Sequence, residues 1–499
     1  MLSSPAEIAA IRATLAESPL FADLAGFALD TLAHCAERVT VRGGEVLFAI
    51  GDEPKALYVV AAGRLRALLP SGAVAGEIGR LEPIGEIGVF SGEARGATVI
   101  ALRDSLLYRF SREAYQAFVL DHPAALLTIS KVIISRLRQN SREARLQTLR
   151  QTRTFAVIAG DAAAVTDTFV PALCQQLARR GSVVRVGADT VDAALGPGTA
   201  ATAFDGSAAD GELLQWLSRL EASHDHLVYD VSGPVSWQQR ALHQADRVLV
   251  LGTAHTPPDP ARAASLQALQ LRAPVDVLLL RPHAASACHA WRTAFAAQGH
   301  YFLRPGDAGD LASLARQLTG HGLGVVLGGG GARGFAHIGL LRALDELKLP
   351  VDLVGGTSMG GFIAALHAFG YDWRMISEVM RDTFVKRNLL SDYLFPRVAL
   401  IEGKKLRRHL IAIFGEAQAE QLAKPFFCVT TNLTQGSAMV HSEGPLAAWI
   451  ATTMCIPGVA PPVAYRGDLL ADGAVVNSLR TDVMQNLGRG AQGAANVVA

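Results

Sequence analysis

Short apolar runs separated by glycine-containing turns fill most of the first 110 residues. Such runs are typical of β-strands, and their close spacing favours a small antiparallel barrel or roll. The predicted strands are Val39–Val41, Val46–Phe48, Leu57–Val60, Leu65–Leu69, Thr98–Leu102 and Leu106–Phe110. A helical tail is predicted to follow from Arg112 towards Gln151, with an amphipathic stretch at Leu126–Leu137.

Between residues 150 and 320 the apolar runs alternate with helical patterns, which favours a parallel sheet. A helix is predicted at Phe169–Ala178, between the first two strands. The predicted strands are Phe155–Ala159, Val183–Val186, Leu227–Val231, Val248–Leu251 and Val275–Leu280. Residues 160–164 stand where a P-loop would, but lack its Gly-Lys-Ser/Thr, and Asp230 resembles a Walker B carboxylate without its partner. We expect a degenerate Rossmann- or P-loop-like α/β domain. It would serve as a spacer or regulatory domain and would not be an ATPase.

Two strand–turn–helix units follow, each with a glycine-rich turn. Their predicted strands, Leu323–Leu327 and Val351–Val354, precede turns at 328–334 and 355–361. Helices are predicted from Phe335 and over Phe362–Leu366. The second turn contains G-x-S-x-G, which places a serine on a sharp turn with its hydroxyl exposed.

Within these turns the candidate residues have separate tasks. Ser358 is the candidate nucleophile, and the small residues Gly356 and Gly360 beside it permit close approach of backbone and substrate. The N–H groups of the first turn could hold the oxyanion of an acyl-transfer transition state.

The serine needs a base, and chain order limits the choice. An α/β-hydrolase places an acid and then a histidine after the serine. The downstream histidines His367, His409 and His441 all precede Asp472, the best acid candidate. A Ser358–Asp472 dyad, in which the carboxylate takes the proton directly, fits these residues better.

The segments GGGGARG (328–334), GGTSMG (355–360), PGVAPP (457–462) and DGAVVNSL (472–479) resemble the motifs of patatin-like phospholipases. The resemblance implies a patatin-like α/β hydrolytic domain in which Ser358 is the nucleophile and Asp472 its base. It also implies an oxyanion hole formed by the N–H groups of Gly329, Gly330 and Gly331. The chain departs from the family pattern at Ala474, where a second glycine is usual, and at NSLR (477–480). These departures keep open a catalytically weak or dead scaffold as the alternative.

Residues 84–99, IGEIGVFSGEARGATV, are similar to the phosphate-binding cassette of cyclic-nucleotide-binding domains. The resemblance implies a short helix that begins after Gly85 and presents N–H groups to a cyclic phosphate. Arg95 would pair with that phosphate, and Glu86 would accept from the ribose hydroxyl. A cyclic nucleotide, cAMP or cGMP, is therefore expected as an effector, and Gly96 favours cAMP. A roll that serves only as a scaffold is the alternative.

The order of a sensor roll with helices, a degenerate α/β domain and a patatin-like domain resembles the neuropathy target esterase-like lysophospholipases. The predicted domains are 1–150, 151–320 and 321–499. The resemblance implies a serine esterase acting on a lysophospholipid or phospholipid, and a short-chain non-lipid esterase is the alternative. Apolar residues near the elbow are candidates for an acyl channel: Phe362, Leu366, Phe369, Leu389, Leu390, Leu394 and Phe395.

Composition and charge argue against several classes of protein. The net charge is +1, so nothing global points to nucleic acid. The five cysteines are scattered without pairing or metal spacing, which fits a reducing compartment. We expect no metal and no cofactor for catalysis. Charges interrupt residues 1–21, so no signal peptide is predicted.

No membrane span is predicted either, and we expect a cytoplasmic protein whose membrane contact, if any, is peripheral; the sequence leaves the oligomeric state open. The basic run at residues 404–408 is interpreted first as a solvated helix face, with anionic head groups as the alternative. Arg333 is interpreted as a residue that steadies the oxyanion turn or meets a lipid phosphate, or else as half of an ion pair. Packing or capping is the favoured role of His337.

Overall fold

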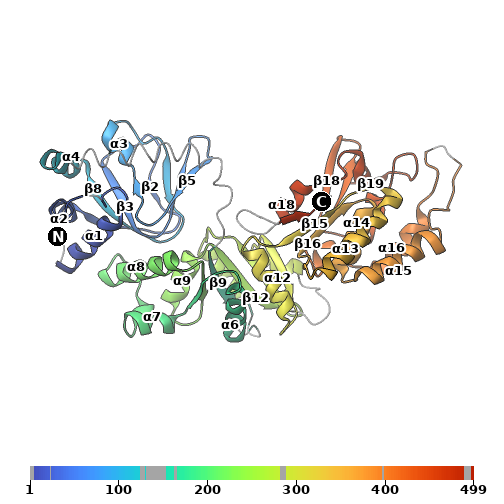
Figure 1. Cartoon of the computed structure of the whole chain (residues 1–499), viewed down its shortest axis with the longest axis horizontal. Helices are drawn as coiled ribbons and strands as arrows, with labels where there is room; N and C mark the ends of the chain where they lie inside the picture. Colours follow the sequence, from blue (N-terminus) through green and yellow to red (C-terminus); the bar gives the residue numbers. More distant parts are fainter. Residues whose placement is uncertain are drawn as a thin grey trace. The chain divides into compact units, whose positions relative to one another are not determined.

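The computed structural model describes residues 5–22, 24–123, 130, 153–161, 164, 166–280, 288–395, 398–487 and 496–498. The chain forms two compact units (Figure 1). The first comprises residues 1–159, 165–250 and 261–275, and the second comprises 160–164, 251–260 and 276–499. Each unit is considered separately.

The first unit begins with two helices, α1 (Pro5–Glu17) and α2 (Gly26–Cys35), and continues into a β-roll. One four-stranded sheet has the order β1 (Glu37–Val41), β8 (Ser105–Ser111), β3 (Ala56–Ala62), β6 (Pro83–Ile84). The other has the order β2 (Val46–Phe48), β7 (Thr98–Ala101), β4 (Leu65–Leu68), β5 (Val74–Ile78). The strand pairs are antiparallel, as expected for a roll.

Two further helices belong to the roll, α3 (Glu86–Ser91) and α4 (Arg112–Asp121). The predicted helical tail begins as α4, at Arg112. The amphipathic stretch predicted at Leu126–Leu137 lies outside the described residues, except for Ser130.

The α/β region has a six-stranded sheet with the order β10-β11-β9-β12-β13-β14. Its strands are β9 (Thr154–Ala159), β10 (Val183–Val186), β11 (His226–Asp230), β12 (Arg247–Thr253), β13 (Val275–Leu280) and β14 (Gly299–Leu303). The pairs β10–β11, β11–β9 and β13–β14 are parallel, as the alternation of strands and helices predicted. The helices are α6 (Thr166–Leu177), α7 (Ala188–Leu195), α8 (Ala208–Ser223), α9 (Val235–Gln244), α10 (Pro260–Ala268), α11 (Cys288–Ala294) and α12 (Ala308–Leu318).

Within the first unit, a buried polar cluster joins the roll to the α/β sheet. Arg64 donates to Glu221 at 2.7 Å and to Asp246 at 2.9 Å. Arg103, only 4% exposed in its side chain, donates to the same Glu221 at 2.5 Å and to the carbonyl oxygen of Gln244 at 3.0 Å. Burial disfavours the charge on Asp246, yet Arg64 and Arg103 hold its pKa below the ordinary value. These contacts tie residues of the roll to residues far along the chain.

The second unit contains a seven-stranded sheet with the order β19-β20-β17-β16-β15-β21, in which β18 also pairs with β17. Strands β15, β16, β17 and β21 are parallel, and β18, β19 and β20 run antiparallel to their neighbours. The strands are β15 (Leu323–Leu327), β16 (Leu353–Thr357), β17 (Phe426–Asn432), β18 (Ser437–His441), β19 (Val463–Tyr465), β20 (Asp468–Asp472) and β21 (Asn496–Val498). The helices are α13 (Ala336–Glu346), α14 (Met359–Phe369), α15 (Trp373–Arg381), α16 (Lys404–Phe414), α17 (Leu446–Thr453) and α18 (Thr481–Leu487).

Helix α14 is the centre of this unit's hydrophobic core. Phe362 and Leu366 are fully buried and pack in one apolar cluster with α13, α15, α16 and α17. These two candidates for an acyl channel therefore belong to the core of the unit, and the channel itself stays a prediction. Leu390, Leu394 and Phe395 are exposed instead.

Candidate active site

The candidate nucleophile lies at a sharp junction between strand and helix. Strand β16 ends at Thr357, and α14 begins at Met359. Ser358 between them has φ 55° and ψ −125°, a conformation that a residue with a Cβ adopts only at a cost in strain. This is the geometry that a nucleophile elbow requires.

Two glycines make the tight junction possible. A Cβ on Gly360 would lie 2.1 Å from the carbonyl oxygen of Leu327 and 2.5 Å from that of Gly328. A Cβ on Gly356 would lie 2.5 Å from the same Leu327 oxygen. The glycine-rich turn after β15 can therefore approach the start of α14 only because neither position carries a side chain.

The hydroxyl of Ser358 faces the carboxylate of Asp472. Ser358 Oγ donates to Asp472 Oδ2 at 2.5 Å, across 114 positions of sequence. Asp472 ends β20, is 2% exposed, and accepts a second hydrogen bond from the Ala474 N–H at 2.9 Å. Burial raises the pKa of Asp472, and the hydrogen bonds from Ser358 and Ala474 oppose that rise without cancelling it. A carboxylate so placed can take a proton from the serine hydroxyl.

The glycine-rich turn lies over the serine. The Cα of Gly329 is so close that a Cβ there would be 3.4 Å from the Cβ of Ser358. The N–H of Gly329 donates weakly, at 3.4 Å, to Ser478 O. Within the described part of the chain, the N–H groups of Gly330 and Gly331 have no hydrogen-bond acceptor. These two N–H groups are therefore free to bind an anion.

Two positioning residues carry no signal in the sequence motifs. Thr453 is fully buried, accepts from the Ser358 N–H at 3.0 Å, and donates to Val429 O, so it fixes the backbone of the elbow. His337 donates from Nε2 to Gly328 O at 2.9 Å and so steadies the glycine-rich turn. Only the position of His337 in the first turn of a helix after the glycines hinted at this role, and the expectation of a packing or capping role agrees with it.

The three histidines that follow Ser358 in the chain make no hydrogen bond to it. His441 Nε2 contacts Thr430 Oγ1 at 2.7 Å, and its ring stacks on Trp449. His409 Nε2 contacts Thr383 Oγ1 at 3.1 Å. Burial lowers the pKa of His441 and of His367 to about 4, so both are neutral at pH 7. In the described residues the only hydrogen-bond partner of the Ser358 hydroxyl is Asp472.

In the roll, the candidate nucleotide-binding residues lie together. Gly85 has φ 77° and precedes α3, which begins at Glu86. Arg95 donates to Gly85 O at 2.8 Å and to Ala56 O, and its guanidinium lies 4.1 Å from the ring centre of Phe48. Burial lowers the pKa of Arg95, although the guanidinium stays charged at neutral pH. Arg95 is thus held inward by backbone carbonyls.

The loop at the P-loop position holds a carboxylate. Asp161 accepts from Thr253 Oγ1 at 2.7 Å, from Thr256 Oγ1 at 3.0 Å and from the Ala164 N–H at 2.7 Å. A negative charge there is unsuited to a triphosphate. The Walker-B-like Asp230 is paired with Arg185 at 2.7 Å.

The described residues contain no group of three or more His, Cys, Asp or Glu side chains that could hold a metal ion. They also contain no helix that is both long and apolar enough to cross a membrane.

Family models match three parts of the chain. Residues 38–122 match the cyclic nucleotide-binding domain, residues 151–320 match the Neuropathy Target Esterase family P-loop like domain, and residues 325–484 match patatin-like phospholipase. With its serine elbow, the protein is thus a multidomain hydrolase of the phospholipase and esterase class. The three matches agree with the predicted fold class, while the exact domain boundaries stay a prediction.

Whole-chain relatives extend this result. The chain is 31% identical to an uncharacterised NTE family protein of Mycobacterium tuberculosis, over 95% of this chain and 78% of that one. It is 30% identical to Lysophospholipase nte1 of Aspergillus fumigatus and 28% identical to Neuropathy target esterase sws of Drosophila melanogaster, in each case over only 35% of the relative. The chain belongs to the NTE family.

Proposed function

We propose that the protein hydrolyses the acyl ester of lysophospholipids through an acyl-Ser358 intermediate, with Asp472 as the only base. The observation that carries this proposal is the 2.5 Å hydrogen bond from Ser358 Oγ to Asp472 at the elbow. A nucleophile within hydrogen-bond reach of its base is the signature of activated-serine chemistry.

In the proposed first half-reaction, Ser358 Oγ attacks the acyl carbonyl carbon and its proton passes to Asp472. The carbonyl oxygen becomes an oxyanion, which the N–H groups of Gly330 and Gly331 stabilise. The bond between the acyl carbon and the glycerol oxygen then breaks. Asp472 returns the proton to that leaving oxygen, while its raised pKa favours the earlier uptake of the proton from Ser358.

In the second half-reaction a water molecule takes the place of the departed alcohol. Asp472 accepts a proton from this water as its oxygen attacks the acyl-Ser358 ester. Collapse of the second tetrahedral intermediate releases the fatty acid, and the proton on Asp472 returns to Ser358 Oγ. The cycle needs one water and leaves both side chains in their starting states.

A lysophospholipid is the substrate we favour. The Aspergillus relative is named a lysophospholipase. Arg333, in the glycine-rich turn, is exposed and makes no ion pair with any described residue, so its guanidinium is available to a lipid phosphate. Val475, Val476 and Leu479 are exposed apolar residues, and Leu479 lies beside Gly328. They offer an apolar rim for an acyl chain.

Two measurements test this function. A fluorophosphonate probe should label the wild-type protein and fail on Ser358→Ala, and labelling at another residue would end the catalytic proposal. For a series of esters, each buried methylene contributes about 0.8 kcal/mol, so kcat/KM should rise roughly fourfold per methylene. A flat series, with short esters best, would favour the alternative of a short-chain non-lipid esterase.

The roll is the second functional candidate, because its cassette matches a cyclic nucleotide-binding domain. We propose that cAMP or cGMP binds there and shifts the esterase activity by about 1–3 kcal/mol of coupling. The cyclic phosphate would replace Gly85 O and Ala56 O as the partner of Arg95. Titration calorimetry with each nucleotide on wild type and Arg95→Gln is the test, and no heat at millimolar ligand would leave the roll a scaffold.

A further inference from the structure

Between α15 and α16, the described residues 392–395 and 398–402 include several exposed apolar side chains. Within it, Tyr393 and Ile401 form an antiparallel bridge, and the Leu394 N–H donates to Leu400 O at 2.9 Å. The Glu402 N–H donates to Asp392 O at 2.9 Å. These bonds pair residues 392–394 with residues 400–402. The described residues 392–395 and 398–402 are here called the α15–α16 loop (Figure 1).

The surface of this loop is strongly apolar. Phe395 is 82% exposed, Tyr393 76% and Val398 73%, and Leu394 and Leu400 are also exposed. Exposed apolar residues scattered singly are ordinary, whereas several on one short loop mark an interaction site.

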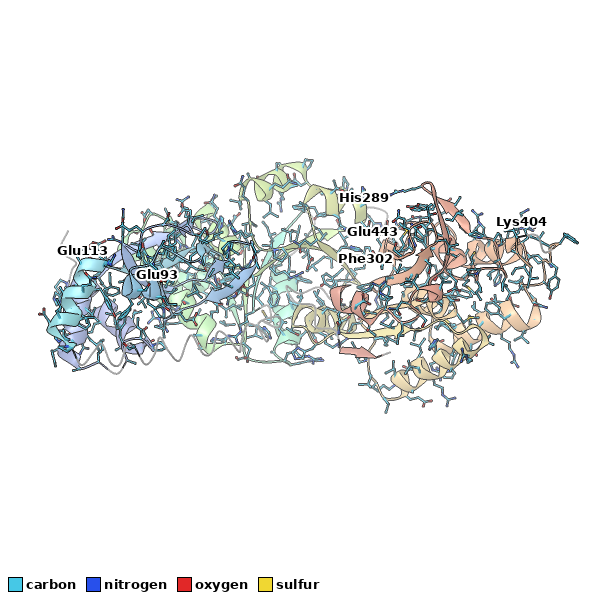
Figure 2. The ribbon with its side chains drawn as sticks, turned by 90° about the horizontal axis from the view of Figure 1, so that it is seen from above. Glu93, Glu113, His289, Phe302, Lys404 and Glu443 are labelled. Atoms are coloured by element: carbon cyan, nitrogen blue, oxygen red, sulfur yellow. The ribbon has the colours of Figure 1, made fainter. Side chains whose placement is uncertain are left out.

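Basic residues flank the loop along the sequence. Residues 381–408 contain eight lysines and arginines but only three acidic residues, although the whole chain has a net charge of +1. Arg407, Arg408 and Lys386 are exposed and make no ion pair among the described residues. Lys404, the first residue of α16, is exposed at the surface of the second unit (Figure 2). Apolar residues flanked by basic ones are the composition that binds an anionic lipid surface.

Backbone hydrogen bonds connect the base of the loop to a segment that also contacts Asp472. The Leu400 and Ile401 N–H groups donate to Val459 O, at 3.1 and 2.9 Å. Residue 459 follows closely on Cys455, whose carbonyl oxygen accepts from the Asp472 N–H at 2.8 Å. Exposed Ile456 lies between them in the chain. The apolar surface is therefore connected to the catalytic strand by one short backbone segment.

We propose that the α15–α16 loop and its basic flanks are a docking surface for an anionic lipid bilayer, which would bring the site of the proposed hydrolase to its substrate. The proposal rests on the proposed function for its purpose, but not for its test. A bilayer is favoured over a protein partner because the loop combines exposed apolar side chains with basic residues. Apolar side chains can enter the boundary of a bilayer while the basic residues meet its anionic head groups. The basic run at 404–408 then has the role of meeting anionic head groups.

Vesicle binding by the full chain with Ser358→Ala tests the surface without any hydrolysis. Vesicles of phosphatidylcholine alone are compared by sedimentation with vesicles holding roughly one third phosphatidylglycerol. We expect binding to the anionic vesicles that weakens in high salt. Tyr393→Ser with Val398→Ser should weaken it at least about tenfold. The matched apolar control is Val235→Ser with Leu347→Ser, two similarly exposed residues elsewhere, and it should bind as the parent does.

A charge variant supplies the second arm. Arg407→Gln with Arg408→Gln should weaken binding to anionic vesicles about 30-fold, since each basic residue near such a surface contributes about 1 kcal/mol. Arg179→Gln with Arg180→Gln removes the same charge from an exposed site elsewhere and should have no effect.

The outcomes separate the two proposals. With Ser358 restored, Tyr393→Ser with Val398→Ser should hydrolyse a short monomeric ester at the wild-type rate and lose activity only on vesicles. Equal vesicle binding by loop and control variants would overturn the docking surface. The docking surface would also be overturned if the protein fails to bind vesicles and instead forms a dimer, seen by sedimentation velocity, that is lost in the loop variant. Vesicle binding by a protein that cleaves no ester would leave the docking surface standing and remove the proposed function.

Discussion

The replacement Asp472→Asn separates the chemical role of this carboxylate from its structural cost. Asparagine keeps the shape and can still accept one hydrogen bond through Oδ1, but it cannot take a proton from Ser358. Loss of a general base costs roughly 10²–10⁴-fold in rate. We therefore expect kcat/KM to fall by that factor, while the fold is retained.

The difference in stability between wild type and this variant should change with pH in a definite direction. Because burial raises the pKa of Asp472 in the folded protein, the folded state holds the proton more tightly than the unfolded state does. The carboxyl group therefore favours folding most at acid pH, and this contribution is lost as the pH rises from the unfolded pKa through the folded one. The free energy of unfolding of wild type minus that of Asp472→Asn should fall by about 1.4 kcal/mol per unit of upward shift.

Thermal or urea unfolding of both proteins from pH 4 to pH 8, together with kcat/KM on a short ester, is the assay. The control is Asp468→Asn on the same strand. The carboxylate of Asp468 accepts from Asn432 at 2.8 Å and from Gln435 at 3.0 Å, and it makes no hydrogen bond to Ser358. It should keep its activity. Activity of Asp472→Asn within tenfold of wild type would refute the role as base. A stability difference that rises with pH would refute the burial argument.

Three further changes probe the elbow and its surroundings. Gly360→Ala should lower stability by about 1–3 kcal/mol or more, because its Cβ would meet a backbone oxygen at 2.1 Å, whereas Gly339→Ala in α13, with open space around it, should raise the melting temperature. Thr453→Val leaves the buried N–H of Ser358 without an acceptor and should cost about 1–3 kcal/mol in unfolding free energy and reduce kcat, whereas an unchanged kcat would deny it a positioning role. Arg333→Gln should reduce kcat/KM for lysophosphatidylcholine but not for a neutral short ester, and equal losses on both would indicate a role in the turn rather than with phosphate.

The sequence predicted strands best where apolar residues dominate the run. Strand β15, Leu323–Leu327, has the predicted bounds because a parallel strand buried on both faces reads as a nearly continuous apolar run. Strand β10, Val183–Val186, also has the predicted bounds, although it lies at the edge of its sheet and its Arg185 is exposed. Strand β5, Val74–Ile78, contains a glycine and a glutamate and is largely exposed, so its pairing with β4 decides its conformation. Strand β14, Gly299–Leu303, begins with glycine and histidine and was missed for the same reason.

The candidate site was predictable where a motif carries the geometry. Ser358 and the glycines around it are readable because the sharp turn demands small residues at fixed offsets. The role of Thr453 could not be predicted from the sequence. It is 95 positions from Ser358, and no motif distinguishes it from other serines and threonines. Phe362 and Leu366 lie in the core, and the sequence alone could not divide the apolar candidates between core and channel, because apolar residues beside an elbow suit either role.

The buried polar cluster between the roll and the α/β sheet bears on how this protein can be divided. A fragment that ends at residue 150 would keep Arg64 and Arg103 but lose Glu221 and Asp246, their carboxylate partners. Removing one side of a buried ion pair typically costs about 3–5 kcal/mol, which is a large part of the stability of a small domain. Exchange of sensor modules between related proteins should therefore transplant the roll together with α8 and the residues up to and including Asp246, so that each guanidinium arrives with its own counter-charge.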